Sequence, residues 1–144
     1  MTIAETQQEI IEEFSMLDGD REMSVMYLIE LGQKLPTLLD DHKAETNLVK
    51  GCQSKVWLVA TLKHDHVYFS ADSNTAITKG LVSLLIRIFS GHLPDEILAG
   101  DLCFMEKIGM DRFIGTQRSN GFASMILRMK QHAQSFKTPS GIKA

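Results

Sequence analysis

Cysteine and proline are scarce in this chain of 144 residues, which contains two cysteines and three prolines. Two cysteines are too few for a disulfide framework or for a metal site with four thiolate ligands. No apolar run approaches the roughly 18–20 residues that a membrane-spanning helix needs. The first basic residue is Arg21, so the sequence shows no signal-peptide n-region. These absences predict a cytoplasmic protein with reduced thiols and no membrane association.

Basic charge is also in short supply. The chain has 15 Lys and Arg against 18 Asp and Glu, a formal net charge of −3. A nucleic-acid binder normally carries a basic excess, so that function class is disfavoured. The 44% of hydrophobic residues suits a globular protein, and the length suits one domain. We expect a single domain over residues 1–144, with a core at about 5–136 and a flexible tail at 137–144.

Two amphipathic helices, which we expect to form a hairpin, are predicted in the first 35 residues. Thr6 and Glu9 have the spacing of a capping box for the first helix. Asp20 is a natural N-cap for the second helix, which ends before Pro36. A polar stretch then predicts a long exposed connection up to Cys52, and loops of this length are often functional.

Two strands follow this connection. Apolar and polar residues alternate over residues 55–63 and again over 66–71, on either side of a short turn, which predicts an antiparallel hairpin. We expect a third strand nearby. Apolar spacing then predicts further helices, with an irregular stretch at 110–120, over about residues 77–88, 94–99, 101–108 and 122–136. The fold class is therefore α+β, a small antiparallel sheet of about three strands with helices packed against it.

Several residues on the predicted helices are expected in the core. Gly80 costs about 1 kcal/mol relative to alanine within a helix, which indicates a close backbone approach there. Cys103 lies between Leu102 and Phe104 and is predicted to be buried, with a resolving or partner thiol as the alternative. Four methionines are also expected to be core residues: Met23, Met26, Met125 and Met129.

Cys52 is the first candidate for chemistry. It follows Gly51, which frees the backbone for a turn, and it is flanked by Lys50 and Lys55. Nearby ammonium groups favour the thiolate, which is the nucleophilic form of sulfur. The residues alone leave two interpretations open, a small buried side chain or a reactive thiol on a loop.

Arg118 also has two interpretations. It precedes Ser119 and Asn120, either of which can cap the last helix, so Arg118 is explained as a surface residue beside a cap. Alternatively, the arginine stabilises a thiolate or binds a partner. His64 and His66 flank a turn, and a hairpin explains them better than a metal clip does. No metal site is predicted.

With these residues in view, the chain resembles the SufE family of cysteine desulfuration proteins. The resemblance runs from about residue 10 to 136, and its most specific part is the Gly-Cys-Gln-Ser stretch followed by Val-Trp. The segments that carry it are Ile29–Gly32 with Leu35-Pro36, Val49–Trp57, Asp72-Ser73 leading to Lys79–Leu81, Ile108-Gly109, and Arg118–Gly121 with Met125.

The resemblance implies a fold shared with iron–sulfur scaffold proteins such as IscU. It implies that Cys52 accepts sulfur from a pyridoxal-phosphate-dependent cysteine desulfurase of the SufS or CsdA type and so stimulates that enzyme. The sulfur then passes to an iron–sulfur scaffold of the SufBCD type or to another recipient. The chain itself is expected to need no cofactor and to act as an activator with a persulfide intermediate, not as a stand-alone enzyme. A homodimer is left open.

The resemblance also suggests partner-binding or loop-supporting roles for Gly51, Gln53, Ser54, Asp72 and Arg118. This chain departs from the usual family pattern after Asp72-Ser73, where it has Asn74-Thr75, and at Lys55. These departures leave the preferred desulfurase open.

The accessibility of the thiol decides how it works. If the loop tucks Cys52 against Trp57 and the strand face, burial raises its pKa, and docking of the partner swings the loop outward. Two other functions compete with sulfur transfer. A thiol redox enzyme or peroxide sensor also uses one cysteine, and an iron–sulfur scaffold shares the fold but needs three or more ligands.

Overall fold

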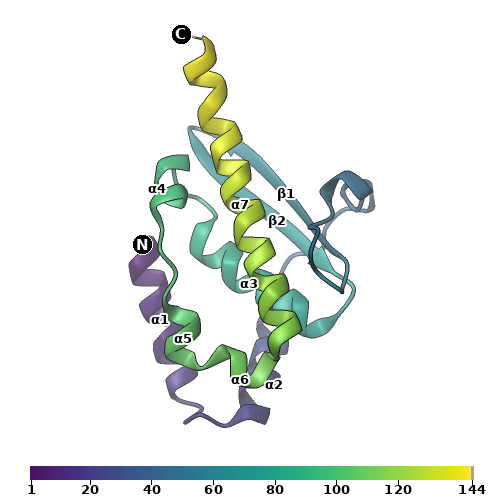
Figure 1. Ribbon diagram of the computed structural model, residues 1–144, viewed down its shortest axis with the longest axis vertical. Coiled ribbons are helices and arrows are strands. Elements are labelled where there is room, and N and C mark those ends of the chain that lie inside the picture. Colours follow the sequence, from purple (N-terminus) through teal and green to yellow (C-terminus); the bar gives the residue numbers. More distant parts are fainter. Residues whose placement is uncertain (144) are drawn as a thin grey trace.

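A β-hairpin lies against a set of α-helices in the computed structural model, which describes the backbone of residues 1–143 and the side chains of residues 1–137 (Figure 1). The fold is α+β, as predicted. In chain order the elements are α1 (Ile3–Ser15), α2 (Arg21–Gln33), the 3-10 turns η1 (Asp40–His42) and η2 (Glu45–Asn47), β1 (Val56–Lys63), β2 (His66–Ser73), α3 (Ala76–Phe89), α4 (Pro94–Ala99), α5 (Phe104–Ile108), α6 (Met110–Ile114) and α7 (Thr116–Lys143).

The sheet has two strands in the described residues, not the three expected. β1 and β2 pair in antiparallel register, from Val56 opposite Ser73 to Lys63 opposite His66. The neighbouring segments add only isolated bridges, Leu48 to Trp57 and a second one to β2. The polar connection before β1 curls into η1 and η2, so it offers no extended run that could pair as a third strand.

The first helix begins earlier than predicted. Its capping box is formed by Thr2 and Glu5, because the apolar face already includes the buried Ile3. Thr6 lies inside the helix and is buried. The N-cap of α2 is confirmed, because the carboxylate of Asp20 accepts a hydrogen bond of 2.9 Å from a backbone N–H of the first turn.

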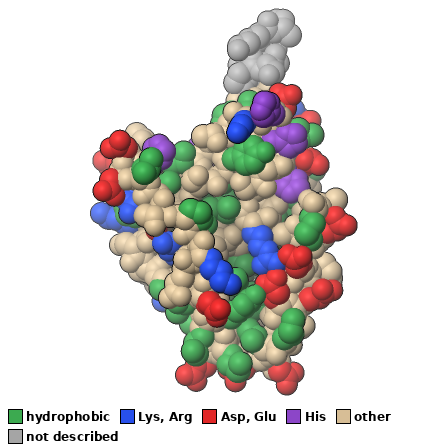
Figure 2. Space-filling model, turned by 180° about the vertical axis from the view of Figure 1, so that it is seen from behind, with side chains coloured by type: hydrophobic (Ala, Val, Ile, Leu, Met, Phe, Trp, Pro, Cys, Tyr) green, Lys and Arg blue, Asp and Glu red, His purple; other side chains and the backbone are tan. Residues whose placement is uncertain are grey.

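The buried face of α2 excludes the two methionines that were expected in the core. Ser24, Leu28 and Gly32 face the core, so Met23 and Met26 are exposed and their core assignment was wrong. The back of the molecule in Figure 2 mixes acidic and basic side chains and gathers apolar ones at its lower end, where α1 meets α2. Leu28 fills the core from this face, and Gly32 has no side chain at the point where α2 and α3 cross closely.

The close approach predicted at Gly80 is confirmed. A Cβ at Gly80 would collide with the backbone oxygen of Leu28, and a Cβ at Gly32 would lie 2.6 Å from the backbone nitrogen of Gly80. The central helix α3 is thereby held against α2 while its other face packs on β2. Met125 and Met129, on α7, are buried as expected.

Three predictions for the C-terminal part need correction. Cys103 is exposed, because the side-chain oxygen of Gln7 accepts hydrogen bonds from the N–H groups of Cys103 (2.8 Å) and Phe104 (3.2 Å), and Phe104 takes the buried position. The stretch at 110–120 is helical except at Gly115, which separates α6 from α7, and α7 already begins at Thr116.

The last helix also bears on the tail and on membrane association. α7 is described as far as Lys143, but the side chains of 138–144 lie outside the described residues, so the flexible tail stays a prediction. Among the described residues, no helix is both long and apolar enough to cross a membrane.

Candidate functional site

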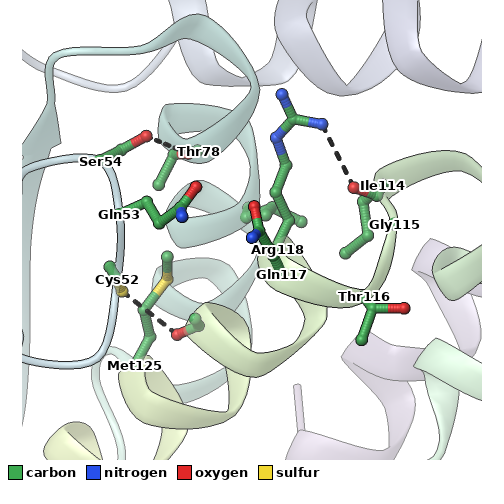
Figure 3. A pocket seen from close by; sticks show the side chains of 12 residues that line it. Cys52, Gln53, Ser54, Thr78, Ile114, Gly115, Thr116, Gln117, Arg118 and Met125 are labelled. Carbon is green, nitrogen blue, oxygen red and sulfur yellow. Dashed lines mark hydrogen bonds between the residues drawn. The ribbon is translucent and has the colours of Figure 1, made fainter.

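A pocket of about 400 Å³ lies between the loop that precedes β1 and the start of α7. Residues of four segments line it, as Figure 3 shows: Cys52, Gln53 and Ser54 from the loop, Thr78 from α3, Ile114 from the end of α6, and Arg118 and Met125 from α7. The structure thus brings together four of the residues singled out in the sequence, three of them from the loop.

The thiol of Cys52 is half-buried at this pocket. Its Sγ donates a hydrogen bond to the backbone oxygen of Gly121, at a distance of 3.4 Å. Gly121 lies within α7, and a Cβ there would stand 3.3 Å from the sulfur, so the missing side chain makes room for the thiol. The shelter is therefore the backbone of α7, whereas the sequence suggested Trp57 and the strand face. Trp57 instead faces the ammonium group of Lys43, 5.7 Å from its ring centroid.

Burial is the main influence on the pKa of the Cys52 thiol. It raises the pKa of the thiol above its ordinary value. Lys50 and Lys55, which were expected to favour the thiolate, are exposed, and water screens their charges. At neutral pH the resting side chain is therefore a neutral thiol, which corrects the expectation drawn from the flanking lysines.

The loop around Cys52 is fixed at its two ends. On one side, the N–H of Val49 donates to the oxygen of Val56 at 2.8 Å. On the other side, the side-chain oxygen of Asn74 accepts a hydrogen bond from the backbone N–H of Lys55 at 3.0 Å. The backbone N–H of Asn74 donates in return to the backbone oxygen of Lys55 at 3.2 Å. Residues 50–54 form the excursion between these anchors and carry the thiol.

Gly51 shapes the tip of this excursion. Its φ of +95° is one that residues with a side chain rarely adopt. A Cβ there would also collide with the hydroxyl of Ser124 on α7. Gly51 therefore lets the loop turn close to the helix just before Cys52.

Ser54 ties the other side of the tip to α3. Its hydroxyl oxygen accepts hydrogen bonds from the hydroxyls of Thr75 (2.9 Å) and Thr78 (3.3 Å). Gln53 is exposed and lies at the mouth of the pocket, in view beside Gln117 in Figure 3.

Asp72 is not part of the pocket lining. It is buried on β2 and pairs with Lys43 and Lys79, each at 3.4 Å, and it accepts from the N–H of Ser73 at 2.8 Å. Burial alone would raise the pKa of Asp72, but the Ser73 hydrogen bond and the two lysines together lower it. Lys43 lies in the polar connection and Asp72 lies on β2, so their ion pair links the connection to the sheet.

Arg118 lies in the first turns of α7 and not in a capping loop. Its side chain is exposed, and Nη1 donates to the oxygen of Ile114 at 3.2 Å. Within the pocket lining that the structure describes, Arg118 is the sole charged side chain. It therefore offers a cation at the pocket mouth.

Sequence reasoning gave no role in the site to several residues of the pocket. Gly121 and Met125 were quoted in the resemblance, with Met125 expected in the core, and neither Gln117 nor Thr78 was predicted to lie at the site. One signal was available for Gly121: once α7 is known to start at Thr116, a glycine inside it indicates a close approach, as it did at Gly80. No local signal pointed to the other three.

Comparisons with known proteins agree with this fold. A family model named SufE and described as an Fe-S metabolism associated domain matches residues 8–133. Uncharacterized SufE-like proteins of Rhizobium etli and Rhizobium meliloti are each 38% identical over 131 residues, covering 88% of this chain and 88% and 93% of their own lengths.

A solved structure shows the same fold. The solution structure of a hypothetical protein from Thermus thermophilus matches with a TM-score of 0.75 and 21% identity, over 92% of this chain and 96% of that one. The family match spans most of the chain, and the Rhizobium relatives match it at an identity that indicates common descent. The chain belongs to the SufE family.

Proposed function

We propose that this protein accepts sulfur on Cys52 from a pyridoxal-phosphate-dependent cysteine desulfurase, stimulates that enzyme, and passes the sulfur on for iron–sulfur cluster assembly. The observation that carries the proposal is the place of the thiol. Cys52 sits on a loop excursion at the edge of a pocket, sheltered by α7 through a contact of 3.4 Å to Gly121. Family membership supplies the link to iron–sulfur metabolism.

The transfer is a thiol–disulfide type of exchange. The thiolate of Cys52 attacks the outer sulfur of the persulfide on the desulfurase, and a new S–S bond forms on Cys52. The S–S bond of the desulfurase persulfide breaks, and its cysteine leaves as a thiolate. The proton that Cys52 loses is available to the leaving thiolate, so no oxidant or reductant is consumed. The persulfide then stands on Cys52 for the next recipient.

The resting state of Cys52 supports sulfur transfer over peroxide sensing. Redox-sensor cysteines are accessible and have a low pKa. Burial raises the pKa of Cys52, so the resting thiol reacts slowly with peroxide. In the proposed function, docking draws the loop out of its shelter, and the thiol becomes a thiolate only when the persulfide faces it.

The remaining candidate residues take two kinds of role in this proposal. Arg118 and Gln53, both exposed at the pocket mouth, contact the desulfurase. Gly51, Ser54 and Asp72 support the loop: Gly51 by its turn, Ser54 by its bonds to α3, and Asp72 by holding Lys43.

The test is the rate of sulfide release by a desulfurase of the SufS or CsdA type, with and without this protein. Wild-type protein and the matched control Cys103→Ser are expected to stimulate the enzyme equally. Cys52→Ser is expected to give no stimulation while retaining its fold. Equal stimulation by Cys52→Ser and wild type would overturn the proposal.

A further inference from the structure

Arg128 connects α7 to the segment that enters the Cys52 loop. Its Nη1 donates to the backbone oxygen of Leu48 at 3.2 Å, and its Nη2 donates to the oxygen of Thr46 at 3.0 Å. These residues lie 80 and 82 positions away in the chain. Leu48 directly precedes Val49, the first anchor of the loop. One guanidinium therefore holds the stem of the loop to the helix.

The third nitrogen of the same guanidinium also donates a hydrogen bond. Nε of Arg128 donates to Nε2 of His132, one helical turn further along, at 3.3 Å. A histidine nitrogen can accept this bond only when the ring is neutral. His132 is half-buried, and its ring meets that of Phe69 on β2 edge-on at 6.5 Å. The packing of His132 thus fixes the plane of the guanidinium.

Arg128, which tethers the loop stem at Thr46 and Leu48, and Gly121, which shelters the thiol, belong to one rigid helix, α7. Gly121 and Arg128 are seven residues apart on α7, which places them two turns or about 10 Å apart along the helix axis. Because the helix sets this separation, the Arg128 bonds determine where the loop stem lies relative to the oxygen that receives the thiol. A loosened stem widens the range of positions open to Cys52.

We propose that Arg128 is a positioning residue that keeps the Cys52 loop in its sheltered position, and that neutral His132 keeps Arg128 aimed at the stem, so that protonation of His132 releases the loop. The tether itself does not depend on the proposed function, but its relevance to sulfur transfer does. Nothing in this arrangement requires a ligand or a second chain.

The direction of the pH effect follows from the surroundings of His132. Burial, and then the positive charge of Arg128, lower the pKa of His132 below its ordinary value. Among the described residues, Arg128 is the charged group that acts on this ring, and β2 contributes the apolar Phe69. The loop is therefore tethered at neutral pH and is released as the pH falls below the ordinary histidine value of about 6.5.

The first test compares alkylation rates of the two cysteines, with the exposed Cys103 as an internal reference. In Arg128→Ala, the Cys52 rate relative to the Cys103 rate is expected to rise about tenfold at neutral pH, since two charge-assisted hydrogen bonds are lost. The matched control is Lys130→Ala, which removes a nearby cation of α7 that bonds the oxygens of Leu98 and Gly100 instead. A ratio in Arg128→Ala equal to those of wild type and the control would contradict the tether.

The second test isolates the histidine and does not depend on whether Arg128→Ala folds. The substitution His132→Gln supplies an amide oxygen that accepts from Nε but does not titrate. The ratio of Cys52 alkylation rates, wild type over His132→Gln, is expected to be near one at pH 7.5 and to rise several-fold towards pH 5.5. A ratio that stays constant with pH would refute the role of His132.

The conservative variant Arg128→Lys keeps the positive charge but has a single ammonium group in place of the planar guanidinium. Its Cys52 alkylation rate is expected to lie between those of wild type and Arg128→Ala.

The failure of this proposal is distinguishable from the failure of the proposed function. Alkylation requires no desulfurase, so it reports the tether alone. If Arg128→Ala exposes the thiol but wild type does not stimulate the desulfurase, the tether stands and the sulfur-acceptor role is wrong. If wild type stimulates the enzyme and Arg128→Ala leaves the alkylation ratio unchanged, the tether is wrong and the sulfur-acceptor role stands.

Discussion

The Sγ of Cys52 lies 3.4 Å from the backbone oxygen of Gly121, a residue 69 positions later in the chain. This contact places a nucleophile against a helix at a residue that has no side chain. It shelters the thiol from water without locking it, because the thiol is otherwise carried by a loop excursion with a glycine at its tip. Changes on either side of the contact are therefore expected to alter the reactivity of the thiol.

Gly121→Ala is expected to separate thiol reactivity from stability. The new Cβ would stand 3.3 Å from Sγ, so the sulfur must move by a few tenths of an ångström, towards the pocket. Alanine inside a helix gains about 1 kcal/mol over glycine, which offsets the cost of this shift. We expect a melting temperature close to that of wild type and faster alkylation of Cys52. Slower alkylation in the variant would count against the shelter.

The acidity of Cys52 predicts a pH effect with a defined sign. Because burial raises its pKa, the folded protein holds the thiol proton more tightly than the unfolded chain. The stabilisation is present below the ordinary thiol pKa and is lost as the pH rises through the raised value. Denaturant unfolding between neutral and alkaline pH is expected to show a steeper loss of stability for wild type than for Cys52→Ser. Parallel curves for the two proteins would contradict the burial effect.

Gly51→Ala is expected to disturb the loop for two reasons, the φ of +95° and the collision with Ser124. A side chain forced into this conformation costs about 1–3 kcal/mol. The matched control is Gly19→Ala, where φ is +75° and no atom lies within 4 Å of the added Cβ. Both variants lose stability in urea unfolding, but only Gly51→Ala is expected to change the alkylation rate of Cys52. An equal change in both would show that the contact with α7 has no part in the effect.

Gly80→Ala tests the helix crossing. The added Cβ would collide with the backbone of Leu28, which cannot move away as easily as the end of a flexible side chain. We expect a loss of about 1–3 kcal/mol in the free energy of unfolding, from the overpacking. An alanine that leaves the unfolding midpoint unchanged would show that α2 and α3 tolerate a wider separation.

Local patterns in the sequence predicted much of the fold. The period of two over residues 55–63 gave the first strand, Asp20 gave the start of α2, and Gly80 gave the helix crossing. These features depend on neighbouring residues or on the properties of one residue type, so a short stretch of sequence is sufficient to show them.

Long-range contacts explain what the sequence did not show. Cys103 turns outward because the side-chain oxygen of Gln7, far away in the chain, accepts a hydrogen bond from the backbone N–H of Cys103. Met23 is exposed because the close crossing of α2 with α3 at Gly32 turns the face of Ser24 and Leu28 inward instead. At the site, the sequence singled out Cys52. It did not show that α7 begins early enough in the chain to shelter this residue. The roles of the other candidate residues stay predictions.

The mass of the protein after incubation with a cysteine desulfurase and cysteine tests the central claim most directly. Sulfur transfer predicts a gain of about 32 Da, located on the peptide that contains Cys52 and removed by a reducing thiol. The same gain is expected in Cys103→Ser and is absent in Cys52→Ser. A gain that persists in Cys52→Ser, or wild-type protein that stays unmodified while the desulfurase turns over, would contradict the account.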